Sequence, residues 1–224
     1  MVPVKVERIM QIIGLDIVGP FPRSKSGHEY VIVAVEYLSR YIIAAPLRST
    51  SALEAAKFVI NDIFLKYGVP ERLNTDNETT FTAEFLEQLV EFSGVCKTYS
   101  SVIHSTGNAL VEKSIGLITR ILKAHCQSDP TNWSASLASA VFSYNTSFHS
   151  TTKYSPAFLM FGRNPHHPEE LMLPLTSTNT DAAAYLRQLH RSRKLALQCI
   201  QEQLKEQKLK YDSSHSNVEY EEAQ

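Results

Sequence analysis

The sequence predicts a mixed α/β fold in which three sequential strands are followed by alternating helices and strands. Short runs rich in β-branched residues occupy most of the first 50 residues, and from residue 51 onward apolar residues recur at helical spacing. The hydrophobic fraction of this 224-residue chain, 43%, is ample for a packed core. We therefore expect one α/β globular core rather than a disordered chain.

Three strand-type segments open the chain, at residues 12–18, 29–36 and 40–47. The Gly-, Pro- and Ser-rich stretch 19–28 is typical of a turn between the first two segments. Because the connections are short, we expect the three strands to be antiparallel. Residues 71–75 and 95–100 are the expected fourth and fifth strands, so the predicted sheet has five strands.

The expected helices follow from apolar stripes with a period of about 3.6 residues. The first stripe begins after a Ser/Thr-rich cap and ends before Gly68 and Pro70. The expected helices cover residues 51–66, residues 82–93, the segment that contains Glu112, residues 133–144 and residues 181–210.

The predicted organisation is a core at residues 1–168, a linker at 169–180, a long basic amphipathic helix at 181–211 and a disordered acidic tail at 212–224. Residues 182–210 carry an excess of five positive charges. The apolar side of this helix is predicted to contain Tyr185, Leu186, Leu189, Ala196, Ile200 and Leu204. That side needs a partner, which is either a second copy of the chain or the chain's own core.

Composition restricts the compartment and the partners. The formal net charge of -1 excludes binding to nucleic acid through bulk charge alone, so any basic patch must be local. Three widely spaced cysteines fit reduced thiols better than disulfides. No apolar run approaches the roughly 20 residues of a membrane span, and the charged opening segment does not suit a secretory signal. We expect a nuclear or cytoplasmic protein that is not secreted and has no membrane partner.

Three acidic residues are candidates for a metal site. Asp16 lies within the first expected strand among apolar neighbours, where an unpaired buried carboxylate costs several kcal/mol. Asp76 follows the fourth expected strand, and Glu112 lies near a helix start. Taken alone, Asp76 suits a turn and Glu112 suits the first turn of a helix, whereas Asp16 has no such explanation. If the three converge, their mutual repulsion predicts bound Mg²⁺ or Mn²⁺.

Several sequence blocks resemble the catalytic core of retroviral and Ty3/Gypsy retrotransposon integrases: GLDIVGPFP, YLSRY, YGVPERLNTDNETTFTAEF and VEK. The later stretch AVFSYNTSFHSTTKYSPAFLMFGRNP is similar to the Gypsy-type continuation. The resemblance covers residues 7–168 and favours Gypsy over retroviral ancestry. It implies an RNase H-like fold with a mixed five-stranded sheet flanked by helices.

The same resemblance implies roles for the three acidic residues. Asp16, Asp76 and Glu112 match the family's D, D and E, and the family's separation of 35 residues between the last two is reproduced. They would hold two Mg²⁺ or Mn²⁺ ions about 3.5 to 4 Å apart against a phosphodiester, with Asp16 as the bridging ligand. The resemblance thus implies a DDE-type polynucleotidyl transferase or endonuclease that acts on DNA as a homo-oligomer, without a small-molecule substrate.

Basic residues on the helix that contains Glu112 predict a DNA-facing surface. At about 100° per residue, Arg120 and Lys123 project within about 80° of Glu112, and Lys113 lies about 100° away. The residues expected to turn toward the core are Ile115, Ile118 and Leu122. Two further candidates for DNA contact are Asn77 and His104.

Four positions depart from the family's pattern: Glu78 replaces a glycine, and Ser105, Thr106 and Ala109 replace loop residues before the glutamate. We also expect neither the family's zinc-binding His/Cys module nor its C-terminal β-domain, so the chain resembles an isolated or host-domesticated core. Two hypotheses follow. One is an active integrase-type transferase or nuclease. The other is an inactive core that binds nucleic acid or acts as a scaffold.

Overall fold

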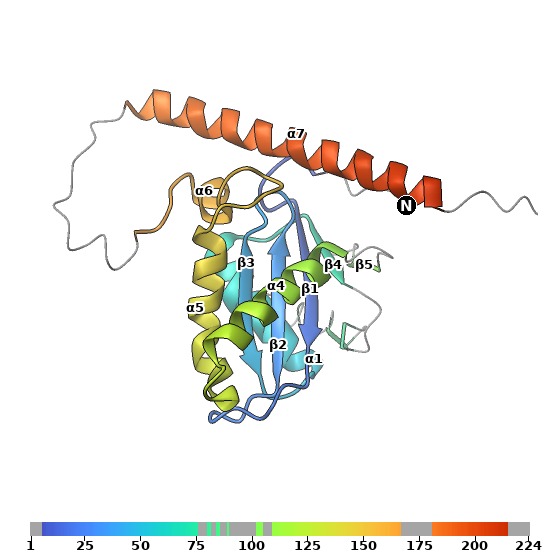
Figure 1. Cartoon of the computed structure of the whole chain (residues 1–224), viewed down its shortest axis with the longest axis vertical. Coiled ribbons are helices and arrows are strands. Elements are labelled where there is room, and N and C mark those ends of the chain that lie inside the picture. The colour runs from blue at the N-terminus through green and yellow to red at the C-terminus, as the bar shows by residue number, and fades with distance from the viewer. Residues whose placement is uncertain are drawn as a thin grey trace, which may run out of the picture.

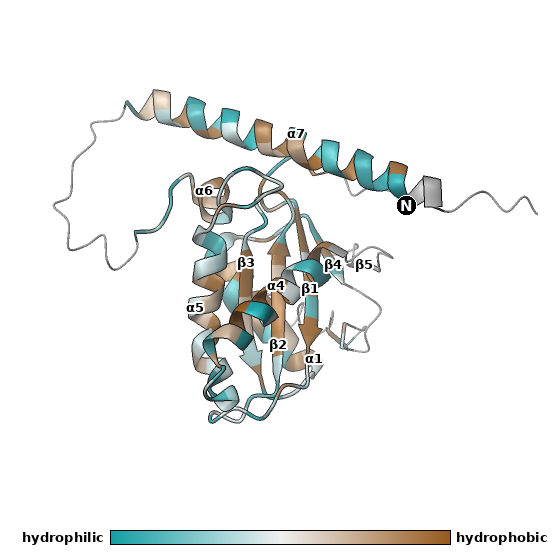
Figure 2. Ribbon diagram, viewed as in Figure 1, coloured by the Kyte–Doolittle hydropathy of each residue, from teal (hydrophilic) through white to brown (hydrophobic). Residues whose placement is uncertain are grey.

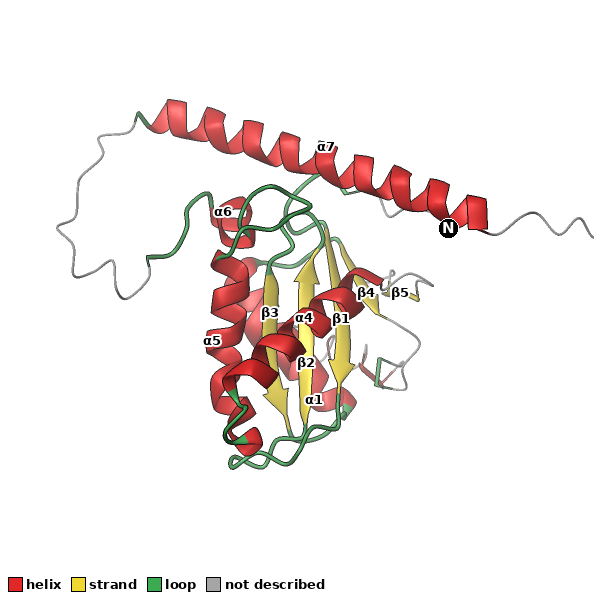
Figure 3. Cartoon of the chain, viewed as in Figure 1, coloured by secondary structure: helices red, strands yellow, loops and turns green. Residues whose placement is uncertain are grey.

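The computed structural model describes residues 6–75, 80, 81, 84, 85, 89, 102–104, 109–166 and 181–214. Its strands form one mixed sheet in the order β3-β2-β1-β4-β5, with helices on both faces (Figure 1). The strands are β1 (Ile12–Val18), β2 (Tyr30–Glu36), β3 (Ile42–Leu47), β4 (Arg72–Thr75) and β5 (Val102–His104). The predicted mixed α/β fold with a five-stranded sheet is confirmed (Figure 3).

Strand directions match the predicted meander. β1 pairs antiparallel with β2, and β2 pairs antiparallel with β3. β4 pairs parallel with β1, and β5 pairs parallel with β4. The position of the fifth strand differs from the prediction, because the structure places it at Val102–His104, while residues 95–100 lie outside the described part of the chain. A three-residue strand is too short to show the alternation of buried and exposed residues by which a strand is recognised in a sequence.

One face of the sheet is covered by a continuous helical segment. It consists of α1 (Ala52–Phe58), the π-helix η1 (Val59–Phe64) and α2 (Leu65–Tyr67). Its apolar residues pack against alternate residues of the central strands, among them Leu15 and Ile32. The predicted helix at 51–66 is therefore confirmed, with a π-helical middle. Of the predicted helix at 82–93, the described residues 84, 85 and 89 are helical.

The opposite face is covered by α4 (Ala109–His125) and α5 (Trp133–Thr146), which follows the short 3-10 helix η2 (Pro130–Asn132). The other alternate residues of β2, Val31, Val33 and Val35, pack against these helices. Figure 2 shows apolar residues concentrated on the central strands that lie between the two helical layers. A short helix that the sequence pattern did not predict, α6 (Pro156–Phe161), follows α5.

The long helix α7 (Ala182–Ser214) packs back on the core. Ala196 and Ile200 are buried, and Leu197 contacts an apolar cluster that contains Tyr37 and Leu38. The sequence left two partners open for the apolar side of this helix, a second copy of the chain or the chain's own core. In the structure this side packs on the chain's own core. Leu186 does not belong to the packed side, since it is 55% exposed.

The helix α7 continues beyond the predicted end at residue 210, whereas the domain boundaries themselves stay a prediction. In the part of the chain that the structure describes, no helix combines the length and apolarity needed to cross a membrane.

Candidate metal and nucleic-acid site

Asp16 lies on the face of the sheet that α4 covers. Its neighbours Leu15 and Ile17 point to the opposite face, into the core beneath α1. Across the β1–β2 pairing, Asp16 stands opposite Val33, which packs with α4. Residues that stand opposite each other in a ladder share a face, so the carboxylate points toward α4. It is 8% exposed, and its Oδ1 accepts a hydrogen bond of 2.7 Å from the Ile17 N–H.

The strand beside β1 leads to Asp76. β4 ends at Thr75, which pairs in parallel with Leu15, and Asn74 pairs with Gly14. Asn74 is buried and donates a 2.7 Å hydrogen bond from Nδ2 to the Tyr37 hydroxyl. This bond ties β4 to the end of β2 across β1. Asp76 and Asn77 themselves lie outside the described residues.

Glu112 lies in the first turn of α4, where its side chain is exposed. The predicted inner face of this helix is confirmed, because Ile115, Ile118 and Leu122 are all buried against the sheet. Since α4 packs on β1 and β2, its first turn is held on the same face as Asp16.

The basic residues predicted on α4, Lys113, Arg120 and Lys123, are exposed. For His104, the structure describes only the backbone, in β5. Among the described residues, no three His, Cys, Asp or Glu side chains gather as a metal-binding group. Only two members of the predicted trio, Asp16 and Glu112, belong to that part of the chain, so the predicted convergence stays a prediction.

A buried polar cluster at the turn between β2 and β3 was missed by the sequence reasoning. Glu36 is 1% exposed, and its carboxylate accepts hydrogen bonds from the Met10 N–H and from both the N–H and the hydroxyl of Ser39. Burial raises the pKa of Glu36, and burial lowers the pKa of Arg40. The signal was present in the YLSRY block, where polar residues directly follow an apolar strand.

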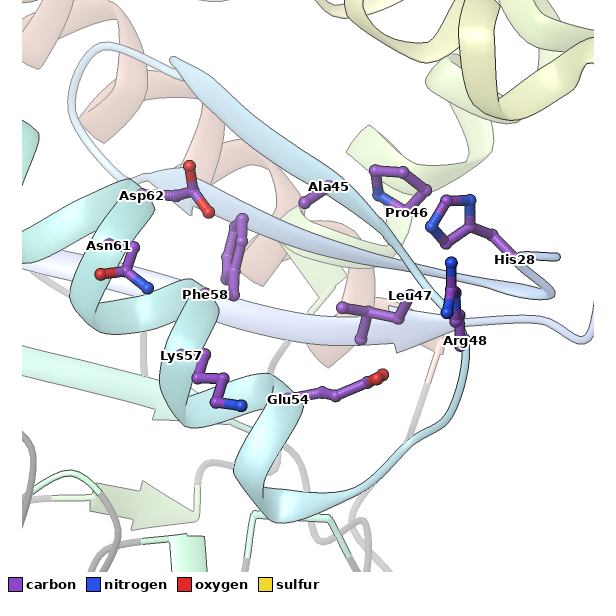
Figure 4. Close-up of a pocket in the computed structure, with 10 residues that line it drawn as sticks. All are labelled: His28, Ala45, Pro46, Leu47, Arg48, Glu54, Lys57, Phe58, Asn61 and Asp62. Atoms are coloured by element: carbon purple, nitrogen blue, oxygen red, sulfur yellow. The ribbon is translucent and has the colours of Figure 1, made fainter. Parts of the chain in front are cut away.

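A pocket of about 420 Å³ lies at the β3 edge, beside the helical segment on the face opposite α4 (Figure 4). Side chains of both charge signs line it, together with Phe58 and Pro46. The carboxylate of Asp62 binds Lys66 Nζ at 2.7 Å, and that of Glu54 accepts a hydrogen bond from the Ser49 N–H. Of the predicted site residues whose side chains the structure describes, none lines this pocket.

The chain is similar in sequence to Gypsy retrotransposon integrase-like proteins. Gypsy retrotransposon integrase-like protein 1 of Homo sapiens is 33% identical over 165 residues, which are 74% of this chain and 31% of the relative. The chain is a homologue of Gypsy integrase cores. The retrovirus-related Pol polyprotein from transposon 412 of Drosophila melanogaster is 28% identical over 155 residues, covering 69% of the chain and 12% of the polyprotein.

The integrase-like chain therefore spans about a third of the length of the first of these relatives. Its fold is that of retroviral integrase cores: the HTLV-2 integrase catalytic core domain, solved in complex with magnesium, matches it with a TM-score of 0.52 at 19% identity. That match covers 67% of the integrase-like chain and 95% of the HTLV-2 domain. No protein-family model matches the chain.

Proposed function

We propose that the chain is a metal-dependent polynucleotidyl transferase or nuclease that acts on DNA, with Asp16, Asp76 and Glu112 as its catalytic, metal-binding residues. The observation that supports this most directly is the place of Asp16, a buried carboxylate in the middle of the sheet on the face covered by α4. Glu112 lies in the first turn of that helix, and position 76 directly follows the strand beside β1. Homology to Gypsy integrases agrees with this assignment.

The donor chemistry of this trio fits Mg²⁺ or Mn²⁺. Three carboxylates supply only oxygen ligands, which magnesium and manganese prefer, whereas structural zinc sites use Cys and His. Positive charge would also offset the cost of holding the Asp16 carboxylate in an apolar strand. When bound, such ions polarise a phosphodiester and lower the pKa of coordinated water.

The remaining side chains of the proposed site would bind and orient the DNA. Exposed Lys113, Arg120 and Lys123 on α4 can neutralise phosphates beside Glu112. Asn77 and His104 flank the acidic residues in the sequence and are proposed as further contacts. Because α4 is packed on two strands, its basic side would be held rigidly relative to Asp16.

We further propose that the chain works as a homo-oligomer in the nucleus or cytoplasm. The HTLV-2 core that shares its fold was solved in a trimeric form. DNA-end joining that uses two ends at once would suit such an assembly.

The second candidate function is a nucleic-acid-binding or scaffolding core without catalysis. Glu78 favours it, since it stands where the family has a glycine and adds a fourth acidic residue near the proposed site. A scaffold of this kind would bind DNA but would neither cleave it nor gain stability from manganese.

Strand cleavage of a short end-labelled DNA duplex in Mn²⁺ separates the two functions. Asp16→Asn and Glu112→Gln should each lower the rate on the order of 100-fold or more, since each removes a metal ligand. The matched control is Glu71→Gln, which removes an exposed carboxylate at the start of β4 and should stay within about twofold of wild type. Equal products from wild type and Glu112→Gln would refute catalysis at this site.

Metal binding provides a second measurement that does not depend on turnover. Manganese at 100 times its Kd should raise the free energy of unfolding of wild type by about 2.7 kcal/mol and leave that of Asp16→Asn nearly unchanged. No stabilisation of the wild type at saturating manganese would leave the scaffold as the better description.

A further inference from the structure

The helix α7 is fixed in its rotation about its own axis. Arg193 donates hydrogen bonds of 2.9 Å from Nε to the Leu159 carbonyl and from Nη2 to the Met160 carbonyl, both on α6. Ala196 and Ile200 are buried on the same side of the helix. These contacts hold one side of α7 against the fold, so the opposite side must face solvent.

That solvent side carries a regular row of cations. At about 100° per residue, five basic residues project within about 60° of the direction opposite Ala196. We call them the α7 basic stripe: Arg187, Arg191, Lys194, Lys205 and Lys208, all exposed. Between Arg187 and Lys208, only one acidic residue, Glu202, reaches the border of the same sector.

The charges of the stripe are largely available for a partner. Arg187 lies 3.6 Å from the Asp181 carboxylate, but both side chains are well exposed, so the pair is screened by solvent. Within the described residues, the other four members form no ion pair. The interleaved residues include Gln198 and Gln201, which can also donate hydrogen bonds.

The length and composition of the stripe fit a nucleic-acid backbone. From Arg187 to Lys208 the helix rises about 31 Å. Duplex DNA carries one negative charge per roughly 1.7 Å of its axis, so a duplex of this length carries about 18 phosphates in total on its two strands. The stripe contains no aromatic residue, whereas protein–protein interfaces are enriched in aromatic anchors. A polyanion with regularly spaced charges therefore fits better than an acidic protein surface.

The middle of α7, which carries the stripe on its solvent side, packs near the proposed site. Leu197, in the middle of α7, and Leu110, in the first turn of α4, contact the same apolar cluster around Tyr37 and Leu38. Glu112 is two residues after Leu110. Figure 1 shows α7 crossing the end of the sheet that is nearest to the start of α4. A duplex that reached Glu112 could therefore continue along α7.

We propose that the α7 basic stripe is a nucleic-acid backbone-binding surface that extends the binding track beyond α4. The inference rests on the proposed function only for the choice of nucleic acid as the polyanion. Binding at the stripe requires neither metal nor catalysis.

The test measures binding of a 20-base-pair duplex in EDTA as a function of NaCl concentration. Replacing Arg191, Lys194 and Lys205 together by Gln should reduce the slope of log K against log salt by about three, since each phosphate contact contributes about 0.9. At low salt the affinity should fall at least about tenfold.

The matched control is the triple replacement of Arg48, Lys57 and Lys66 by Gln. Lys57 and Lys66 are exposed on the opposite helical layer, and Arg48 is exposed in the loop between β3 and α1. Their replacement changes net charge equally but should leave the slope within about 0.5 of wild type. Circular dichroism and urea unfolding of both variants establish that the replacements leave the fold intact.

An unchanged slope and affinity in the α7 variant would overturn the inference, as would an equal loss in the control. A variant that loses affinity for polyglutamate but not for the duplex would overturn the choice of nucleic acid. If the α7 variant changes the slope but the wild type shows no metal-dependent cleavage, the proposed function is refuted and the inference about the stripe stands.

Discussion

Asn145 closes the free edge of the sheet, and its replacement should destabilise the whole core. Asn145 lies in α5 and is 3% exposed. Its Oδ1 accepts a 2.9 Å hydrogen bond from the Ile42 N–H, and its Nδ2 donates a 2.8 Å bond to the Ile42 carbonyl. Ile42 begins the edge strand β3, so the side chain amide occupies the place of a neighbouring strand.

The cost of Asn145→Ala follows from these two bonds. Each bond contributes about 0.5 to 1.5 kcal/mol, and each backbone group left buried without a partner costs about 1 to 3 kcal/mol. Partial access of water to the vacated space lowers the sum, so we expect a loss of about 2 to 4 kcal/mol. Urea unfolding followed by circular dichroism should show a lower midpoint with an unchanged m value.

The adjacent residue provides a matched control. The Thr146 hydroxyl bonds only to the carbonyls of Phe142 and Ser143 within its own helix, and the residue is partly exposed. Thr146→Ala should therefore change stability by about 0.5 kcal/mol or less. If Asn145→Ala also stays within that margin, the edge of β3 does not depend on this amide, and the reasoning fails.

Two further predictions concern pH and the attachment of α7. Burial, reinforced by the charge of Arg40, lowers the pKa of His149 to about 4. The unfolded ring binds its proton near pH 6.5, so this contribution to stability is present above that pH and is lost as the pH falls toward 4. Allowing for partial exposure of the ring, urea unfolding should show about 1 kcal/mol less stability at pH 5 than at pH 7. His149→Gln should abolish that difference. Gly162 ends α6 with a φ of 81°, and an added Cβ would lie 2.9 Å from Leu189 of α7. Gly162→Ala should cost about 1 to 2 kcal/mol and accelerate hydrogen exchange in α7; exchange as slow as in wild type would show that this junction does not hold the helix.

Much of the fold is predictable from local patterns because runs of β-branched residues indicate strands and periodically spaced apolar residues indicate the buried faces of helices. The first three strands are β-branched-rich and bounded by turn residues, and the buried stripe of α4 has helical spacing. The helix α6 has only six residues, too few for a periodic stripe, and depends on the Ser155 cap and on Gly162. The strand β5 is shorter still and is specified by its pairing with β4, which no local window contains.

Local sequence patterns are even less informative about the candidate site, because its side chains depend on contacts between distant residues. Asp16 is an acidic residue in an apolar strand, and Glu36, at the end of the apolar strand β2, has nearly the same sequence surroundings. In the fold, Glu36 is held by donors from Met10 and Ser39 and supports a turn. Sequence spacing alone could not distinguish the structural carboxylate of Glu36 from the carboxylate of Asp16, which lies on the face that α4 covers. The difference depends on which distant residues contact each side chain in the fold.

The Glu36 carboxylate and the Asn74 amide both act at the end of the sheet where β2 ends. Glu36 ties the approach to β1, through the Met10 N–H, to the turn that follows β2. Asn74 ties β4 to Tyr37 at the same end of β2, and the cluster around Tyr37 also receives Leu110 of α4 and Leu197 of α7. The first turn of α4, the end of β2 and the middle of α7 are therefore fixed to one another at this end of the sheet. A loss of packing at Leu197 should thus alter the position of Glu112 and the direction of the α7 basic stripe together.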